Sequence, residues 1–211
     1  MTHPPIHFLA VYGTLTPQPI VLANAEELTT YSRWVRGTIR EFLHFSGRVL
    51  ATKIITGRYL TVEIARYPLL AHSYTREDGL VAVAITLREY PTELVHRLLQ
   101  RAIQRYPDTR WMLDRTDATQ TDPEYLALIA QYQDPITADP IKNVQRKIEQ
   151  VQAVAVTAID KLLVRGETIS ELVAKSNDLS ISSKKFYQKS EDVNGCCWRW
   201  LGWKRHSGDT D

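Results

Sequence analysis

Arg165 is the residue whose surroundings in the sequence most demand a chemical explanation. It interrupts a row of mostly apolar residues that recur in alternating steps of three and four. A guanidinium group has five N–H donors and no acceptor, and burying it without partners costs several kcal/mol. We therefore expect acceptor oxygens from other chains to meet Arg165, and we expect this contact to set the register of a helical assembly.

The row itself predicts a surface along which helices assemble. A repeat of 3.5 residues keeps one stripe of a helix facing its partners along a supercoil. The serines in its second half predict weaker packing there unless partners supply bulk. The alternative is an ordinary coiled-coil helix whose Arg165 extends to solvent. The members of this row, called the seam positions below, are Ile141, Val144, Ile148, Val151, Ala155, Ala158, Leu162, Arg165, Ile169, Leu172, Ser176, Leu179, Ser183, Phe186, Ser190 and Val193.

A second group of chemically capable residues follows the seam. Cys196 and Cys197 are adjacent, and Trp198, Trp200 and Trp203 come directly after them among basic residues. Either thiol is a candidate for palmitoylation, and indole rings beside basic groups suit the headgroup region of a bilayer. The pattern predicts peripheral attachment to a membrane surface through a lipid or the tryptophans. The alternative is an end without structure.

The remaining residues do not predict catalysis. The histidines stand singly, so we interpret them as structural or exposed and expect no metal site and no cofactor. The sequence contains no phosphate-binding glycine loop, no nucleophile elbow and no paired-histidine helix. We therefore expect that the protein is not an enzyme. Tyr31, Trp34 and Phe42 are interpreted as packing residues, because aromatic residues at helical spacing usually pack.

Composition narrows the class of protein further. The 26 basic and 24 acidic residues nearly balance, which argues against a nucleic-acid partner. The first thirty residues do not resemble a secretory signal, no run of eighteen apolar residues occurs, and the two adjacent cysteines suit a reducing compartment. These features predict a cytoplasmic protein with peripheral membrane association.

Two groups of elements must position these residues. Residues 1–133 are predicted to form an α+β fold, a five-stranded antiparallel sheet with covering helices. Residues 134–140, DPITADP, read as a linker. Residues 141–193 contain no proline and a single glycine, and predict one coiled-coil helix of about 80 Å. Residues 194–211 form the membrane-proximal tail.

In the first part, residues 1–133, strand-like runs begin near residues 7, 20, 58, 69 and 80, and helical runs cover 29–54, 91–105 and 122–132.

The segment from Leu162 to Ser190, LLVRGETISELVAKSNDLSISSKKFYQKS, resembles the R-SNARE motif of the synaptobrevin superfamily. Arg165, Gly166 and Glu167, together with the cysteine pair, are most similar to its lipid-anchored subgroup, which carries a longin domain of profilin-like fold in front. The resemblance implies that Arg165 is the central layer of a four-helix bundle with Qa-, Qb- and Qc-SNARE helices. It also implies vesicle docking and fusion at Golgi, ER, endosomal or vacuolar membranes.

The sequence departs from that subgroup at its end. Residues 198–211 follow Cys197, so the sequence as it stands predicts no prenylation.

Free in solution, a long helix would expose its apolar seam. We therefore expect residues 141–193 to be disordered or folded back on the first part, against the helix at 31–49 and the third strand. A competing hypothesis is a longin-domain coiled-coil adaptor that self-associates without fusing membranes. Mixing the protein with Qa-, Qb- and Qc-SNARE helices discriminates between the two.

Overall fold

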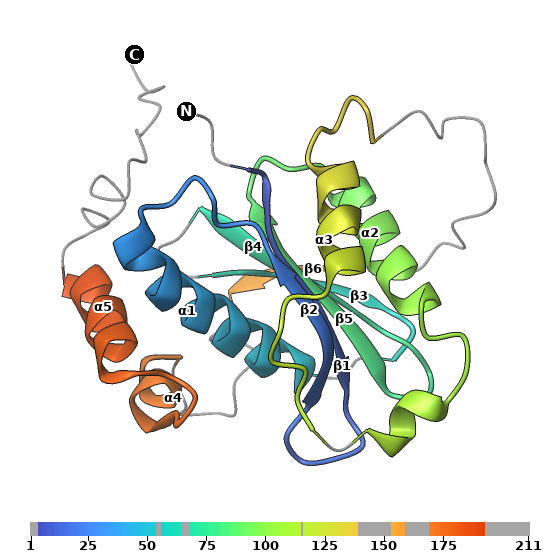
Figure 1. Cartoon of the computed structure of the whole chain (residues 1–211), viewed down its shortest axis with the longest axis horizontal. Coiled ribbons are helices and arrows are strands. Elements are labelled where there is room, and N and C mark those ends of the chain that lie inside the picture. The colour runs from blue at the N-terminus through green and yellow to red at the C-terminus, as the bar shows by residue number, and fades with distance from the viewer. Residues whose placement is uncertain are drawn as a thin grey trace.

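A six-stranded sheet forms the centre of the computed structural model, which describes residues 4–53, 56–64, 68–114, 116–138, 153–158 and 169–192 (Figure 1). The strands lie in the order β2-β1-β5-β4-β3-β6. Five of them, β1 to β5, pair antiparallel, which confirms the predicted five-stranded antiparallel sheet of an α+β fold. The strands are β1 (Ile6–Gly13), β2 (Ile20–Glu26), β3 (Tyr59–Glu63), β4 (Leu69–Thr75), β5 (Leu80–Leu87) and β6 (Ala153–Ala158).

Two interior strands, β1 and β5, explain why the sheet could be predicted from the sequence. Every residue of β1 is buried, and so is every residue of β5 except the last, because helices cover both faces of the sheet. Such strands appear as continuous apolar runs rather than as alternating patterns.

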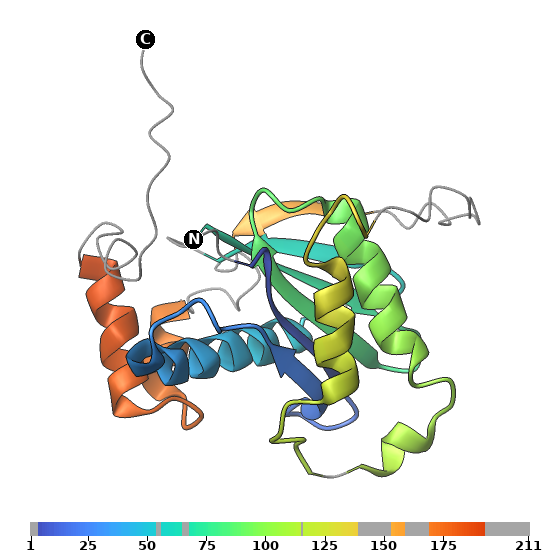
Figure 2. The same ribbon diagram turned by 45° about the horizontal axis from the view of Figure 1, so that its top comes forward.

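Helices cover the two faces of the sheet unequally (Figure 2). Helix α1 (Arg33–Ala51) lies on one face and packs Leu43 and Leu50 against it. Helices α2 (Thr92–Gln104) and α3 (Pro123–Tyr132) lie on the other face. The short helix η1 (Arg110–Leu113) comes between them in the chain. Asp122 caps α3, since its side chain accepts from the first free N–H groups, and Pro123 occupies the first turn.

The region predicted as one helix over 141–193 has a different conformation in the chain on its own. Its described residues form β6, then α4 (Ile169–Lys175) and α5 (Ile181–Asp192). β6 adds in parallel to the edge of β3, where Tyr59 pairs with Ala153 and Glu63 with Ala158. α4 and α5 lie beside α1 (Figures 1 and 2). This arrangement agrees with the expected fold-back against the first helix and third strand.

Local hydrogen bonds explain the break between α4 and α5. The Asp178 N–H donates to Ser176 Oγ at 3.1 Å, and the Ser183 N–H donates to Ser180 Oγ at 3.2 Å. Serine side chains that bond to nearby backbone groups compete with helix continuation and favour helix starts. Packing on α1 buries apolar residues of both helices and of their connection, among them Val173, Leu179 and Tyr187.

Candidate helix-assembly surface

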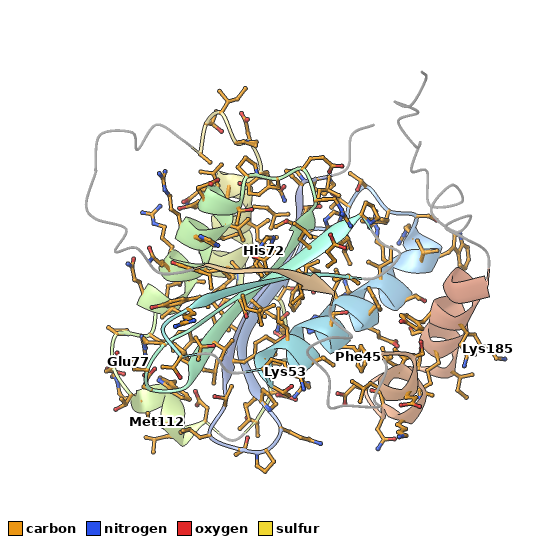
Figure 3. All side chains as sticks on the ribbon, turned by 180° about the vertical axis from the view of Figure 1, so that it is seen from behind. Phe45, Lys53, His72, Glu77, Met112 and Lys185 are labelled. Carbon is orange, nitrogen blue, oxygen red and sulfur yellow. The ribbon has the colours of Figure 1, made fainter. Side chains whose placement is uncertain are left out.

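The side of α1 that α4 and α5 cover is an apolar surface. Residues 169–192, which form α4, α5 and their connection, are called the covering segment below. Phe42 and Phe45 of α1 belong to one buried cluster with Val173, Leu179 and Tyr187 from this segment. The rings of Phe42 and Tyr187 lie 6.0 Å apart between centroids with an interplanar angle of 30°. Figure 3 shows Phe45 on α1 next to the covering helices. Aromatic packing of this kind adds to the free energy gained by removing apolar area from water.

Glu41 of α1 marks the start of α5. Its Oε2 accepts the backbone N–H of Ser180 at 2.8 Å, directly before Ile181, the first residue of that helix. The free N–H groups at a helix start favour a negative charge. Burial raises the pKa of Glu41, but the N–H of Ser180 and the hydroxyl groups of Ser183 and Ser180 outweigh it and hold the pKa below its ordinary value. The carboxylate therefore stays ionised at neutral pH.

Arg48, near the end of α1, joins three segments. Its Nη1 donates to the Pro19 carbonyl at 2.6 Å, and its Nη2 donates to Asp117 Oδ2 at 2.9 Å. Its Nε lies 3.6 Å from Asp178 Oδ2, in the connection between α4 and α5. Burial lowers the pKa of Arg48, while the hydrogen bond to Asp117 and the charges of Asp117 and Asp178 raise it by more. The sheet domain thus offers the covering segment one fixed anion and one fixed cation.

The covering segment uses the seam itself to pack. Four seam positions have described side chains: Leu179 and Ser183 are 6% and 4% exposed, and Leu172 and Ser176 are half-buried. Leu172 packs against the same cluster as Phe42. A surface buried in this way is not open to another helix, so any assembly through these seam positions would require α4 and α5 to leave α1.

Other predicted site residues have only a backbone position or none. Ala155 and Ala158 lie in β6, Ile169 in α4, and Phe186 and Ser190 in α5. The remaining seam and tail positions fall outside the described residues: Ile141, Val144, Ile148, Val151, Leu162, Arg165, Val193, Cys196, Cys197, Trp198, Trp200 and Trp203.

The sequence did not indicate four residues of this surface. Val173 and Tyr187 are buried but stand beside the seam rather than in it, and Glu41 and Arg48 stand in a helix whose apolar face alone was predicted. The one available signal was the position of Tyr187 directly after Phe186, since an aromatic residue next to a seam extends its apolar width.

His72 is buried in the sheet between two threonine side chains. His72 Nδ1 lies 3.0 Å from Thr61 Oγ1 and its Nε2 lies 3.2 Å from Thr86 Oγ1, inside the sheet. Burial lowers the pKa of His72 to about 3. Within the described ranges, no three His, Cys, Asp or Glu side chains group to hold a metal ion, and no helix is long and apolar enough to cross a membrane.

Comparison with known proteins covers both parts of the chain. The family model described as Synaptobrevin matches residues 140–204. Synaptobrevin homolog ykt6 of Schizosaccharomyces pombe is 32% identical over 186 residues, which cover 86% of this chain and 92% of that protein. VAMP-like protein YKT61 of Arabidopsis thaliana is 30% identical over 182 residues, with 85% and 90% covered. Synaptobrevin homolog YKT6 of Saccharomyces cerevisiae is 29% identical over 201 residues, with 91% and 98% covered.

Proposed function

Because the chain belongs to the synaptobrevin family, as a longin-type R-SNARE of the ykt6 subgroup, we propose that it contributes one helix to a four-helix SNARE bundle. It is a SNARE protein of vesicle trafficking and not an enzyme. The proposed partners are one Qa-, one Qb- and one Qc-SNARE helix, and the contributed helix spans residues 141–193. The observation that carries this proposal is the apolar seam interrupted by Arg165 within the residues that match the family.

Arg165 is assigned the central layer of that bundle. Its N–H donors would meet glutamine side-chain oxygens from the three partner helices, which can satisfy a buried guanidinium without a counter-charge. A bundle slipped by one heptad would leave the charge without acceptors at a cost of several kcal/mol. Arg165 therefore selects register, while the other seam positions supply the stabilisation.

Burial of the apolar seam positions would provide the free energy that stabilises the bundle. Each large apolar side chain buried in a layer contributes roughly 1.5–3 kcal/mol before the cost of ordering the chain is subtracted. Assembly must first detach the seam from the sheet domain, because Leu179 and Ser183 are buried there in the isolated chain. The sheet domain thus acts as a cover that partner helices displace.

Membrane attachment is assigned to the tail. Palmitoylation of Cys196 or Cys197 provides one signal, and Trp198, Trp200 and Trp203 among basic residues provide a second. One acyl chain alone holds a protein only marginally, whereas two signals make the attachment stable. The protein is then cytoplasmic and peripheral on Golgi, ER, endosomal or vacuolar vesicles.

Mixing the full chain with Qa, Qb and Qc helices tests the assembly. We expect a heat-resistant complex with one copy of each chain, and we expect Leu172→Asp to abolish it because the change buries a charge in a layer. The matched control is Leu113→Asp, at an exposed position of η1, which should assemble normally. A complex that forms equally well with Leu172→Asp contradicts the proposal.

The register role of Arg165 needs a separate readout. Arg165→Leu should keep the four chains together but allow shifted pairings, which cross-links between chains would detect as mixed registers. The adaptor hypothesis instead requires self-association of the chain alone, measured by sedimentation without partners. A single unchanged register in Arg165→Leu would remove the assigned role.

A further inference from the structure

Trp34, in the first turn of α1, is 94% exposed. The sequence had suggested a packing residue, and its neighbours Tyr31 and Phe42 are indeed buried. Trp111 is buried as well, at 4% exposure, so exposure is not general for the tryptophans that the structure describes. A large indole left in water forgoes the free energy that its burial would provide, which marks it as a contact surface.

The turn that carries Trp34 is held firmly by its surroundings. The Tyr31 hydroxyl lies 2.7 Å from His7 Nε2 in the interior. Arg36 braces the same turn, since its Nε donates to the Tyr31 carbonyl at 2.8 Å and its Nη2 to the Thr29 carbonyl at 2.6 Å. The exposure of Trp34 is therefore a property of a braced helix start rather than of a loose loop.

Trp34 continues a stripe that the covering segment leaves unfinished. Trp34, Thr38, Glu41 and Phe45 follow helical spacing and share one face of α1. Glu41 accepts from Ser180 and Phe45 is buried, so α4 and α5 cover the later part of this face. Among the residues that the structure describes, none buries Trp34 in the first part of this face.

We propose that Trp34 and Arg33 bind an anionic membrane surface in the folded-back state. This inference rests on the proposed function, because it takes the tail as the membrane anchor. Arg33 precedes Trp34 and is exposed, and Lys185 is exposed on α5, the helix that lies beside α1 (Figure 3). Indole rings settle at headgroup depth, and guanidinium groups bind phosphate oxygens.

The end of α5 supports a membrane rather than another occupant. Cys196 follows Asp192, the last residue of α5, by four residues, a span of at most about 14 Å. A lipid on that cysteine would hold the side of α1 and α5 near the bilayer, away from α2 and α3 (Figures 1 and 2). The basic residues Arg199, Lys204 and Arg205 lie beside the tail tryptophans and repel Arg33, which disfavours that part of the tail as the occupant, while the acidic residues Asp209 and Asp211 come only after it.

Vesicle binding of the full chain tests the proposal, with phosphatidylcholine vesicles that contain or lack phosphatidylserine. We expect Trp34→Ala to lower the binding constant for vesicles with phosphatidylserine roughly tenfold. Arg33→Glu should weaken binding to those vesicles alone. The matched control is Ile136→Ala, which removes another exposed apolar side chain, 87% exposed, beyond α3. All three positions are exposed, so the free energy of unfolding should change little.

Three outcomes would overturn the inference. In the first, Trp34→Ala binds vesicles as well as the wild type or as Ile136→Ala does. In the second, Trp34→Ala loses the same amount of binding to vesicles without phosphatidylserine. In the third, Trp34 is already shielded from an aqueous quencher before vesicles are added. The last is read in a chain whose tail tryptophans are replaced by phenylalanine, and it would identify the tail as the occupant. Assembly with the Q-SNARE helices, measured on the same Trp34→Ala protein, separates the two proposals: absence of assembly by the wild type counts against the proposed function alone.

Discussion

At the scale of single residues, a few polar contacts beside the apolar cluster help to hold α4 and α5 against α1. Glu41 holds the start of α5, and Arg48 faces Asp178 just before it. The Arg48 pair is partly solvated, so its contribution is small, whereas the Glu41 contact satisfies a helix N–H that would otherwise lack an acceptor.

Glu41→Ala should therefore loosen α5. The loss of this cap costs about 1 kcal/mol, which raises the open population roughly fivefold. Hydrogen exchange of the α5 amides measures the change, and faster assembly with Q-SNARE helices should accompany it. The control is Glu77→Ala, an exposed acid in the turn between β4 and β5. Equal exchange in the two variants would show that Glu41 does not hold α5.

His72 makes the stability of the sheet depend on pH. Its pKa is about 3 in the folded chain, lowered first by burial and then by His96, against an ordinary 6.5. Below pH 6.5, the imidazole of His72 therefore binds a proton in the unfolded chain but stays neutral in the folded chain. The free energy of unfolding consequently falls as the pH drops from 6.5 toward 3. Burial also lowers the pKa of His96, which adds to the same trend.

His72→Gln tests this. Between pH 6 and 4.5, the slope of the free energy of unfolding against pH should decrease by up to about 1.4 kcal/mol per pH unit, the value for one proton. Urea unfolding at several pH values gives the slope. If the variant keeps the slope of the wild type, His72 is not the group that takes up the proton.

At the scale of elements, residues 153–158 carry a conflict between two conformations. AVAVTA forms β6 in the folded-back chain, yet the same residues must be helical in the proposed bundle. Alanine favours helix and valine favours strand, so the segment is close to balance between the two. The neighbouring sheet edge decides in favour of the strand, because β3 offers unpaired backbone groups.

Ala153→Val should shift that balance toward the strand without altering a seam position. The valine raises strand propensity and lowers helix propensity by several tenths of a kcal/mol each, so assembly with Q-SNARE helices should slow about threefold. Stopped-flow measurement of assembly checks this. Ala127→Val in α3, an exposed position, should leave the rate unchanged. Faster assembly of Ala153→Val would contradict the strand-to-helix requirement.

At the scale of the whole molecule, the sheet domain would compete with the proposed bundle for one seam. Binding of the partner helices should therefore detach β6 from β3 and α5 from α1 together. Hydrogen exchange with and without the Q-SNARE helices should show faster exchange for Tyr59–Glu63 on assembly, while the interior strands β1 and β5 stay protected. Protection of β3 that persists in the assembled complex would mean that the bundle forms without opening the cover.

The sequence by itself determined the elements whose patterns are local. Continuous apolar runs identified β1 and β5, helical periodicity identified α1 and α2, and Asp122 with Pro123 identified the start of α3. The seam and the role of Arg165 stay predictions, drawn from a repeat of 3.5 residues that is typical of helices in a supercoiled assembly.

Tertiary structure alone decided what the seam does without those partners. The residues of β6 have no strong preference for strand, so the free edge of β3 determines their conformation. Glu41 and Arg48 gain their roles from segments more than a hundred residues away in the chain, and no local pattern encodes such contacts. Trp34 has helical spacing like Phe42, yet it is 94% exposed, whereas Phe42 is buried beside Tyr187 of α5.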